Sequence, residues 1–273
     1  MKLQFHLPLM TYPDATSFTL LQNAVQVARS EKADLNINVH QVAVPLLSPP
    51  FPTMLDLRKL KEEAEQSSRE AGAALTTTLK DYAEKAAIGI SICSFECAEP
   101  FVGSRIAESS RLYDLTILEA SEIGRPIVES VLFESGRPVL LFPTDSCPDP
   151  FDTIAIAWDG SPTMARALTG ARGFLGRSSK IILISITDEK LIEAANRDLF
   201  ATVLRKSGLL VHVISAQSDD VSPAITLQAV AKENGAKLLV AGGFGHSKFR
   251  EFVLGGVTRS LLGNLDMPAL LSH

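Results

Sequence analysis

The chain alternates short apolar runs with helical patterns along its whole length, and this alternation constrains the fold more than any other feature. In the later half, Thr153–Trp158 has no helical period and lies between Pro150 and Asp159-Gly160, as expected of a buried strand. Ser161-Pro162 then supplies a capping residue and a proline suited to the first helical position. Repeated strand–helix units predict a parallel sheet with helices on both faces.

The later half carries further segments of both kinds. Strands are predicted at 181–186, 209–214, 237–241 and 267–271, and helices at 163–175, 191–206, 222–234 and 257–262. On the second of these helices, we expect one apolar stripe to face the core; it consists of Leu191, Ala194, Ala195, Leu199 and Val203.

The first half has the same order of elements. Strands are predicted at 3–6, 35–44, 88–94, 115–119 and 138–142, and helices at 17–30, 57–85, 102–111 and 126–133. The run GRPVLL at 136–141 matches DMPALL at 266–271, and the strand before each also matches. We therefore predict tandem copies offset by about 130 residues. The predicted fold class is α/β: two tandem doubly wound, Rossmann-like domains at 1–144 and 151–273. Each is a mainly parallel five-stranded sheet with helices on both faces.

Composition excludes several classes of protein. The net charge of −5 and the pI of about 5.6 argue against nucleic acid as the partner, because such binders usually carry a basic face. No apolar run approaches the roughly 20 residues of a membrane-spanning helix, and Pro8, Pro13 and Asp14 interrupt any secretory layout at the N-terminus. We expect a cytoplasmic protein with no membrane partner. Cys93 and Cys97 lack metal or redox spacing, and we interpret them as small residues at the end of a buried strand.

A glycine-rich segment at 241–258 carries the strongest chemical signal. Its first glycines, Gly242 and Gly245, follow a predicted strand, and Gly255-Gly256 opens a predicted helix. Phosphate binding needs backbone N–H groups that converge without a Cβ in the way, and it gains from the positive end of a helix dipole. Thr258 adds a hydroxyl in the first helical turn. The alternative is that these glycines serve only a tight turn and a helix start.

This segment resembles the nucleotide-binding signature of the universal stress protein family. The resemblance rests on Gly242, two residues, Gly245, nine residues and Gly255, followed by Gly256-Val257-Thr258 and the final MPALL strand. It covers nearly the whole chain as a tandem pair, and it is specific in the second copy and faint in the first. Members of the nucleotide-binding branch hold ATP between this loop and the first two strand ends.

The resemblance also implies roles for particular residues. Asp159 would accept a hydrogen bond from the nucleoside, and helix capping is its alternative role. Ile186 would contact the adenine through its backbone. The alternative is that Ile186 only packs in the hydrophobic core. The remaining implied contacts are Ala241 and Gly242 to base and sugar, and Gly245, Gly255, Gly256 and Val257 to phosphates. One departure is Gly256, where the family commonly has Ser or Thr, so a hydroxyl contact is lost. Trp158 beside Asp159 is also unusual, and either flanks the base or packs at the strand end.

The first copy lacks this signature. The matching place reads Glu119-Ala120-Ser121-Glu122, without glycine and with two carboxylates that would repel phosphate. We expect this half to bind no nucleotide and to act as an internal partner of the second. The last strands, near 139–142 and 269–272, are the expected contact of this internal pseudo-dimer, because edge strands seek a partner. A homodimer of the whole chain is a further arrangement.

The predicted function is that of an ATP-binding universal stress protein with a regulatory, stress-response role and no catalysis. AMP or ADP are alternatives to ATP, and Mg²⁺ would accompany the nucleotide. The sequence contains no P-loop, no HExxH and no nucleophile elbow. Two other functions stay open: a slow ATPase or phosphotransfer enzyme, and a protein-interaction module in which the glycine loop binds nothing.

Overall fold

A computed structural model describes residues 2–45, 56–144, 150–188, 194–218, 221–243 and 256–273, with side chains undescribed at 256–259. In the first half, strands and helices alternate as follows: β1 (Gln4–Leu9), α1 (Phe18–Glu31), β2 (Asp34–Val42), α2 (Leu57–Ala86), β3 (Ile90–Cys97), α3 (Val102–Ser110), β4 (Leu115–Ala120), α4 (Arg125–Glu134) and β5 (Val139–Pro143). Every strand and helix predicted for this half is present, with ends shifted by a few residues.

The second half repeats this order, with one helix interrupted. Its elements are β6 (Thr153–Ala157), α5 (Pro162–Gly170), α6 (Arg172–Leu175), β7 (Lys180–Ile186), α7 (Ala194–Lys206), β8 (Leu210–Ala216), α8 (Pro223–Glu233), β9 (Leu238–Gly242), α9 (Gly256–Gly263) and β10 (Ala269–Ser272). The helix expected over 163–175 divides at Ala171, which follows Gly170, and glycine is a poor helix former.

Serine caps the first helix of each half. Ser17 accepts a hydrogen bond from Leu20 N at 3.1 Å, and Ser161 accepts one from Met164 N at the same distance. Pro162 occupies the first turn of α5, as predicted, and Pro223 occupies the first turn of α8. Ser222 makes no side-chain cap and instead donates to Ser260 Oγ at 2.7 Å, which joins α8 to α9.

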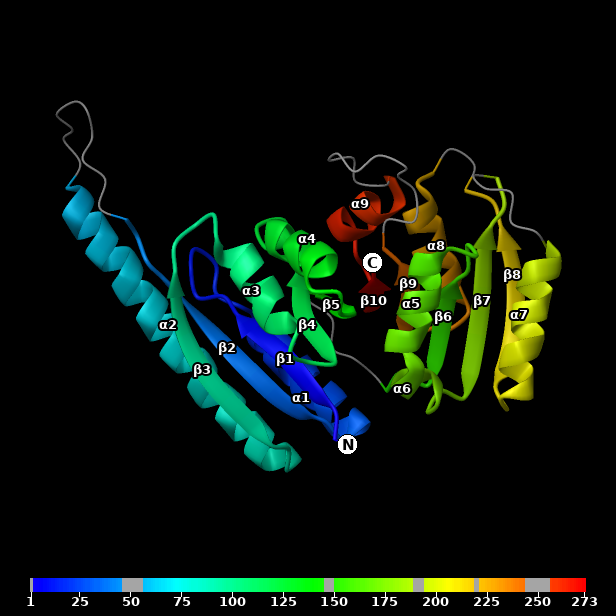
Figure 1. Cartoon of the computed structure of the whole chain (residues 1–273), viewed down its shortest axis with the longest axis horizontal. Coiled ribbons are helices and arrows are strands. Elements are labelled where there is room, and N and C mark those ends of the chain that lie inside the picture. Colours follow the sequence, from blue (N-terminus) through cyan, green and yellow to red (C-terminus); the bar gives the residue numbers. More distant parts are fainter. Residues whose placement is uncertain (1, 46–55, 145–149, 189–193, 219–220, 244–255) are drawn as a thin grey trace.

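The two halves form one sheet. Ten strands lie in the order β3-β2-β1-β4-β5-β10-β9-β6-β7-β8, and Figure 1 shows them running from β3 on the left to β8 on the right. All neighbouring pairs are parallel except β5 and β10, which are antiparallel. Each half is therefore a five-stranded parallel sheet, and the predicted fold class is confirmed.

The antiparallel pair of β5 and β10 has an internal two-fold symmetry. Leu140 pairs with Leu270, and on either side Leu141 pairs with Ala269 and Val139 with Leu271. Residues 139, 140 and 141 thus occupy the places of 269, 270 and 271, an offset of 130 residues. The predicted contact between the last strands of the two halves is confirmed.

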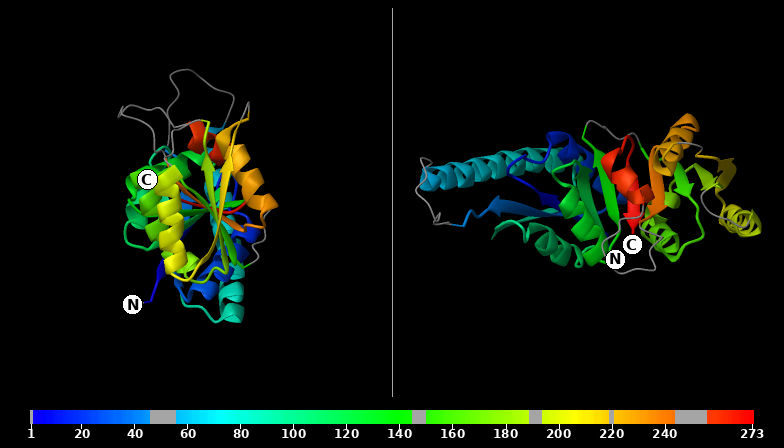
Figure 2. Two further views of the ribbon diagram at one scale, coloured as in Figure 1. Left: turned by 90° about the vertical axis from the view of Figure 1, so that its right-hand side faces the viewer. Right: turned by 90° about the horizontal axis from the view of Figure 1, so that it is seen from above.

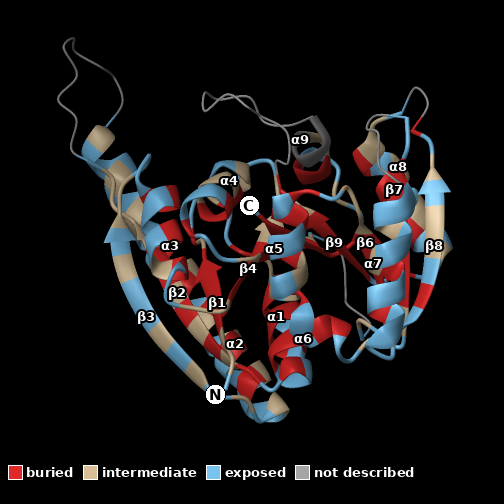
Figure 3. Cartoon of the chain, turned by 45° about the vertical axis from the view of Figure 1, so that its right-hand side comes forward, coloured by how far each residue is buried: buried red, intermediate tan, exposed pale blue. Residues whose placement is uncertain are grey.

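Helices cover both faces of the sheet, as the side view in Figure 2 shows. One face carries α1, α2, α5, α6 and α7, and the other carries α3, α4, α8 and α9. The buried apolar residues form one cluster on each face, and each cluster runs across both halves. Each hydrophobic core therefore belongs to the chain as a whole. Figure 3 shows the buried central strands, with more exposed strands at the two edges. Among the described residues, no helix has both the length and the apolarity to cross a bilayer.

Two expectations about burial are wrong. Cys93 is exposed, because β3 is the outermost strand of the sheet and not an inner one. On α7, the predicted stripe residues Ala194, Ala195, Leu199 and Val203 are exposed, and Leu191 lies outside the described residues. The buried residues of this helix are Ala201 and Leu204. An edge helix has apolar residues on more than one side, so spacing alone did not identify the face that packs.

Side-chain contacts reinforce the junction between the halves. Glu31 at the end of α1 is buried and accepts a hydrogen bond from Arg177 Nε at 3.1 Å. Pro138 packs against Gly170, where an added Cβ would lie 2.7 Å from the proline ring. The rings of Phe133 and His273 meet edge to face at 4.9 Å. Burial and the nearby Arg166 lower the pKa of His273 below its usual value, which favours the neutral ring at this contact.

Because the cores are continuous, we expect the chain to unfold in one transition. Leu270 is fully buried at the centre of the junction, so Leu270→Ala should lower the free energy of unfolding by about 2–5 kcal/mol. Urea denaturation followed by far-UV circular dichroism reports on both halves, and the fluorescence of Trp158, the one tryptophan, reports on the second. The two curves should coincide in both proteins. Leu199→Ala on the exposed face of α7 is the control, and two separate transitions would contradict a shared core.

One buried histidine makes stability depend on pH. His6 on β1 is fully buried, its Nδ1 lies 3.0 Å from Ser110 Oγ, and its ring stacks on Tyr113 at 4.9 Å. Its Nε2 has no partner among the described residues. Burial disfavours the charged ring and lowers the pKa of His6 from 6.5 to about 3.

The unfolded chain consequently binds one more proton than the folded chain between these two pKa values. The contribution of His6 to stability is complete above pH 6.5 and decreases by about 1.4 kcal/mol per pH unit as the pH falls toward 3. His6→Asn, which can keep the bond to Ser110, should reduce this slope in urea titrations between pH 7 and 5. His212→Asn on the exposed β8 is the control, and an unchanged slope in His6→Asn would exclude this origin.

Candidate functional site

The predicted site residues gather at the carboxyl edge of the second half. Asp159 follows β6, Ile186 ends β7, and Ala241 and Gly242 end β9. In the strand order, β6 lies between β9 and β7, so the chain leaves β6 toward one side of the sheet and later returns to the other. Open α/β sheets bind ligands in the crevice at such a switch point. The described members of the predicted set therefore lie where this fold binds ligands.

Asp159 is ordered by the turn that starts α5. Its Oδ1 accepts a hydrogen bond from Ser161 N at 2.9 Å, and Gly160 between them has a φ of +70°. Side chains with a Cβ rarely adopt that backbone conformation, so glycine suits this position. This bond orders the segment before α5, whereas the residue that caps the helix is Ser161. A carboxylate can accept several hydrogen bonds, so this contact and a ligand contact are compatible.

Gly242 is fixed by close packing. A Cβ at this position would lie 2.7 Å from Met164 N and 2.7 Å from Thr163 Oγ1, both in the first turn of α5. The neighbouring Gly243 donates its N–H to Ser272 O at 2.7 Å, and a Cβ there would approach Leu132 and Ser272. The strand end and the helix start thus touch through backbone atoms. This contact explains the Gly242-Gly243 pair without any ligand.

Ile186 and Ala241 line the apolar interior near this edge. Both are buried and belong to the cluster on the α8–α9 face. Ala241 pairs with Ala157 on one side and Leu271 on the other, and Ile186 pairs with Ala216. The core role considered for Ile186 is present. Any contact of these two residues with a ligand would involve mainly their backbone.

The phosphate-binding members of the set are only partly described. Gly245 and Gly255 lie outside the described residues. Gly256, Val257 and Thr258 form the first turn of α9, with no description of their side chains. Because β10 is parallel to β9, the helix between them runs back along the sheet and begins at the carboxyl edge. The positive end of the α9 dipole therefore lies on the same edge as Asp159 and Gly242.

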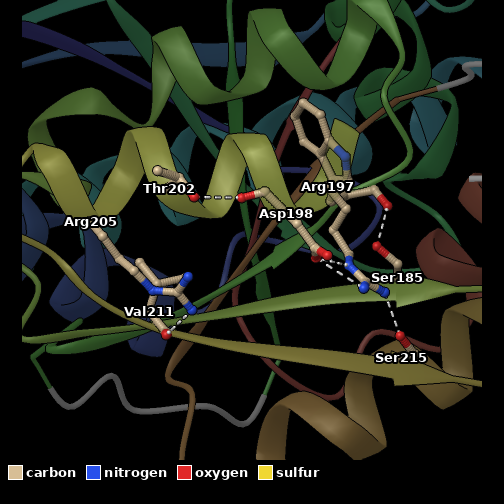
Figure 4. Close-up of polar contacts among 8 residues, drawn as sticks. Ser185, Arg197, Asp198, Thr202, Arg205, Val211 and Ser215 are labelled. Atoms are coloured by element: carbon tan, nitrogen blue, oxygen red, sulfur yellow. Dashed lines mark hydrogen bonds and ion pairs between the residues drawn. The ribbon is translucent and has the colours of Figure 1, made fainter. Parts of the chain in front are cut away.

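Trp158 is half-buried beside the site. Its ring stacks on Phe200 of α7 at 4.1 Å, and its carbonyl oxygen accepts a hydrogen bond from Ser185 Oγ at 3.0 Å. Figure 4 shows Ser185 and Arg197 in this region. The strand-end packing considered for Trp158 is therefore what the structure contains.

Arg197 joins α7 to the ends of the strands. It donates to Ser215 Oγ on β8 at 2.5 Å and to Asp198 Oδ1 through Nε at 3.1 Å and Nη2 at 3.0 Å (Figure 4). Arg205, two turns further along, donates to Val211 O at 3.0 Å. These bonds fix α7 and therefore the Trp158–Phe200 stack. Sequence analysis missed Arg197, because its partner Ser215 lies on another element and no local pattern connects them.

The first half has different side chains at the equivalent positions. Strand register gives the equivalences: Thr116 pairs with Val139 as Leu239 pairs with Ala269, so Glu119 stands where Gly242 stands. His6 pairs with Thr116 as Ala155 pairs with Leu239, which puts Met10 in the place of Asp159. The first half thus has the apolar Met10 in place of Asp159, and the acidic Glu119 in place of Gly242.

Glu119 contacts the start of α1 through its side chain, whereas Gly242 contacts the start of α5 through its backbone. Its Oε1 accepts from Ser17 Oγ at 2.5 Å and its Oε2 from Ser17 N at 3.4 Å, at the start of α1. A carboxylate is favourable at a helix N-terminus because of the dipole. The first half therefore carries a carboxylate at the position equivalent to Gly242, and this charge would repel a phosphate.

Residues 150–273 match the model of the Universal stress protein family. This second half belongs to that family. Comparison with curated protein sequences gives no significant match. No group of three or more His, Cys, Asp or Glu side chains that could hold a metal occurs in the part of the chain that the structure describes.

Solved structures extend the similarity to the whole chain. A universal stress protein from Archaeoglobus fulgidus is 19% identical with a TM-score of 0.74, and covers 99% of this chain and 96% of that one. A putative universal stress protein from Pseudomonas aeruginosa is 17% identical with a TM-score of 0.60, and covers 98% and 92%. A functionally unknown protein from Pseudomonas aeruginosa is 17% identical with a TM-score of 0.59, and covers 98% of this chain and 92% of that one. These similarities establish the fold of both halves, and the predicted resemblance to universal stress proteins is confirmed by the family model in the second half and by the fold in the first.

The packing of Gly242 predicts a stability effect apart from any ligand. Gly242→Ala places a methyl group against the backbone of α5 and should lower the free energy of unfolding by about 1–3 kcal/mol. Gly263→Ala in α9 is the matched control, because a Cβ there meets no heavy atom within 4 Å. Urea midpoints measured without nucleotide compare the two variants. Equal stability of both would show that the strand end relaxes away from α5.

Proposed function

We propose that the second half binds one adenine nucleotide, and that the chain is a regulatory universal stress protein acting in a cytoplasmic stress response. ATP with Mg²⁺ is the proposed ligand, with AMP or ADP as alternatives. The observation that supports this most is the joint position of Asp159, Gly242 and the start of α9 on one edge at the switch point of the sheet. The family match over the same residues agrees with it.

The proposed contacts follow from the chemistry of each group. Asp159 would accept a hydrogen bond from the sugar, while the backbones of Ile186, Ala241 and Gly242 would line the base and sugar. Gly245, Gly255, Gly256, Val257 and Thr258 would hold the phosphates through N–H groups and one hydroxyl. The described end of β9 carries no acidic side chain, in contrast with Glu119 in the first half, so it fits an anionic ligand.

We propose that the protein is not an enzyme. Among the described residues at this edge, none has the arrangement of a nucleophile with its base, and the hydroxyls of Ser161 and Thr163 bond to each other at 2.9 Å within the helix cap. Both hydroxyls are buried. A regulatory protein that senses nucleotide needs binding alone. Turnover of labelled ATP by the purified protein would favour the slow ATPase instead.

The first experiment is calorimetric titration of nucleotide-free protein with Mg-ATP, AMP and cyclic AMP. We expect one site per chain. Gly256→Ser should tighten ATP binding by roughly 10-fold or more, because it restores the hydroxyl that the family commonly has at this position and a hydrogen bond to a charged group contributes about 1.5–3 kcal/mol.

Gly263→Ser at the end of the same helix is the matched control and should leave affinity unchanged. This design adds a contact, so reduced folding cannot produce the expected result. Absence of binding by all three nucleotides in both the parent and Gly256→Ser would contradict the proposal and favour a protein-interaction module.

A further inference from the structure

A cavity lies in the first half at the position equivalent to the proposed nucleotide site. Its volume is about 440 Å³, and it opens between the segment after β1 and the segment from the end of β4 to the start of α4. Strands β1 and β4 are neighbours at the switch point of this half, as β6 and β9 are in the other. Small-molecule sites usually measure about 300–1,000 Å³ and occur at such switch points. Both position and size are those of a ligand site.

The base of this cavity is apolar. Leu20 on α1, Leu118 on β4 and Val128 on α4 are buried and line it, together with the half-buried Met10 and Ile127. Met10 replaces the acid that stands at this position in the second half. The cavity therefore offers an apolar ligand more contact surface than the equivalent edge with Asp159 does.

Four carboxylates line the same cavity: Asp14, Glu99, Glu119 and Glu122. The lining contains no Lys, Arg or His among the described residues. Arg125, the nearest cation along the chain, already binds Glu129 Oε1 at 2.9 Å. Glu119 bonds to the start of α1, which leaves Asp14, Glu99 and Glu122 exposed around the opening. Like charges in this number repel a phosphate and attract a cation.

We propose that this cavity is a second binding site, which takes a small molecule that joins a protonated amine to an apolar body. The amine would lie among the carboxylates, and the apolar body would bury Met10 and the leucines behind it. The two halves would then bind ligands of opposite charge at opposite edges of one sheet, because β5 and β10 are antiparallel. This inference rests on the first half alone and does not require nucleotide binding by the second.

Two probes with the same ring and opposite charge test the proposal. Tryptamine carries a protonated amine on an indole, and indole-3-propionate carries a carboxylate on the same indole. Titration of the full chain at low ionic strength, by calorimetry or ligand-observed NMR, should detect one site for tryptamine and at least 10-fold weaker binding of indole-3-propionate. Failure of tryptamine to bind, or equal binding of both probes, would overturn the proposal.

A triple variant locates the site. Asp14→Asn, Glu99→Gln and Glu122→Gln together remove the exposed carboxylates and should weaken tryptamine binding at least 10-fold. The matched control, Glu63→Gln, Glu108→Gln and Glu134→Gln, removes the same charge from exposed positions outside the cavity and should leave binding unchanged. Circular dichroism verifies that both variants are folded. Equal binding by both triple variants would overturn the proposal, and displacement of tryptamine by ATP would place the probe in the second half instead.

Discussion

The antiparallel pairing of β5 with β10 determines the rest of the structure. Each strand closes the parallel sheet of its own half and supplies the neighbour that the other half lacks. The symmetry of the pairs around Leu140 and Leu270 keeps the pleats of both sheets in phase, so apolar residues reach the same two faces across the junction. The helices on each face can then pack on one continuous core.

The two halves keep this framework while their functional edges differ. Equivalent positions, identified from strand register, carry side chains of different chemistry: Asp159 corresponds to Met10, and Gly242 corresponds to Glu119. In both halves a serine caps the helix that follows the first strand, so the local backbone does not explain the difference. The side chains at the edge can change because they contribute little to the junction. We propose on this basis that residues 1–144 and 151–273 are the units of ligand specificity.

Strand and helix periodicity predicted nearly all of the fold, because buried parallel strands and capped helices leave local signals such as Ser161-Pro162. Burial at the ends of the sheet was not predictable in the same way. Leu199 and Cys93 are exposed because α7 and β3 lie at the edges, and sheet order is not encoded by periodicity. At the candidate site, the sequence identified Asp159 and Gly242. Their contacts with α5 and the Arg197 bonds depend on long-range packing, as does the cavity of the first half.

Covalent joining of the halves has a consequence for their assembly. Separate chains that met through such an antiparallel pair would dissociate on dilution, and their pairing would follow protein concentration. Here the linked segment keeps the two partners at a fixed effective concentration and in a one-to-one ratio. The two halves therefore need not be identical, because the covalent link keeps them together whatever their sequences. One polypeptide thus contains both members of a pseudo-dimer, and the side chains at equivalent positions, such as Met10 and Asp159, differ between them.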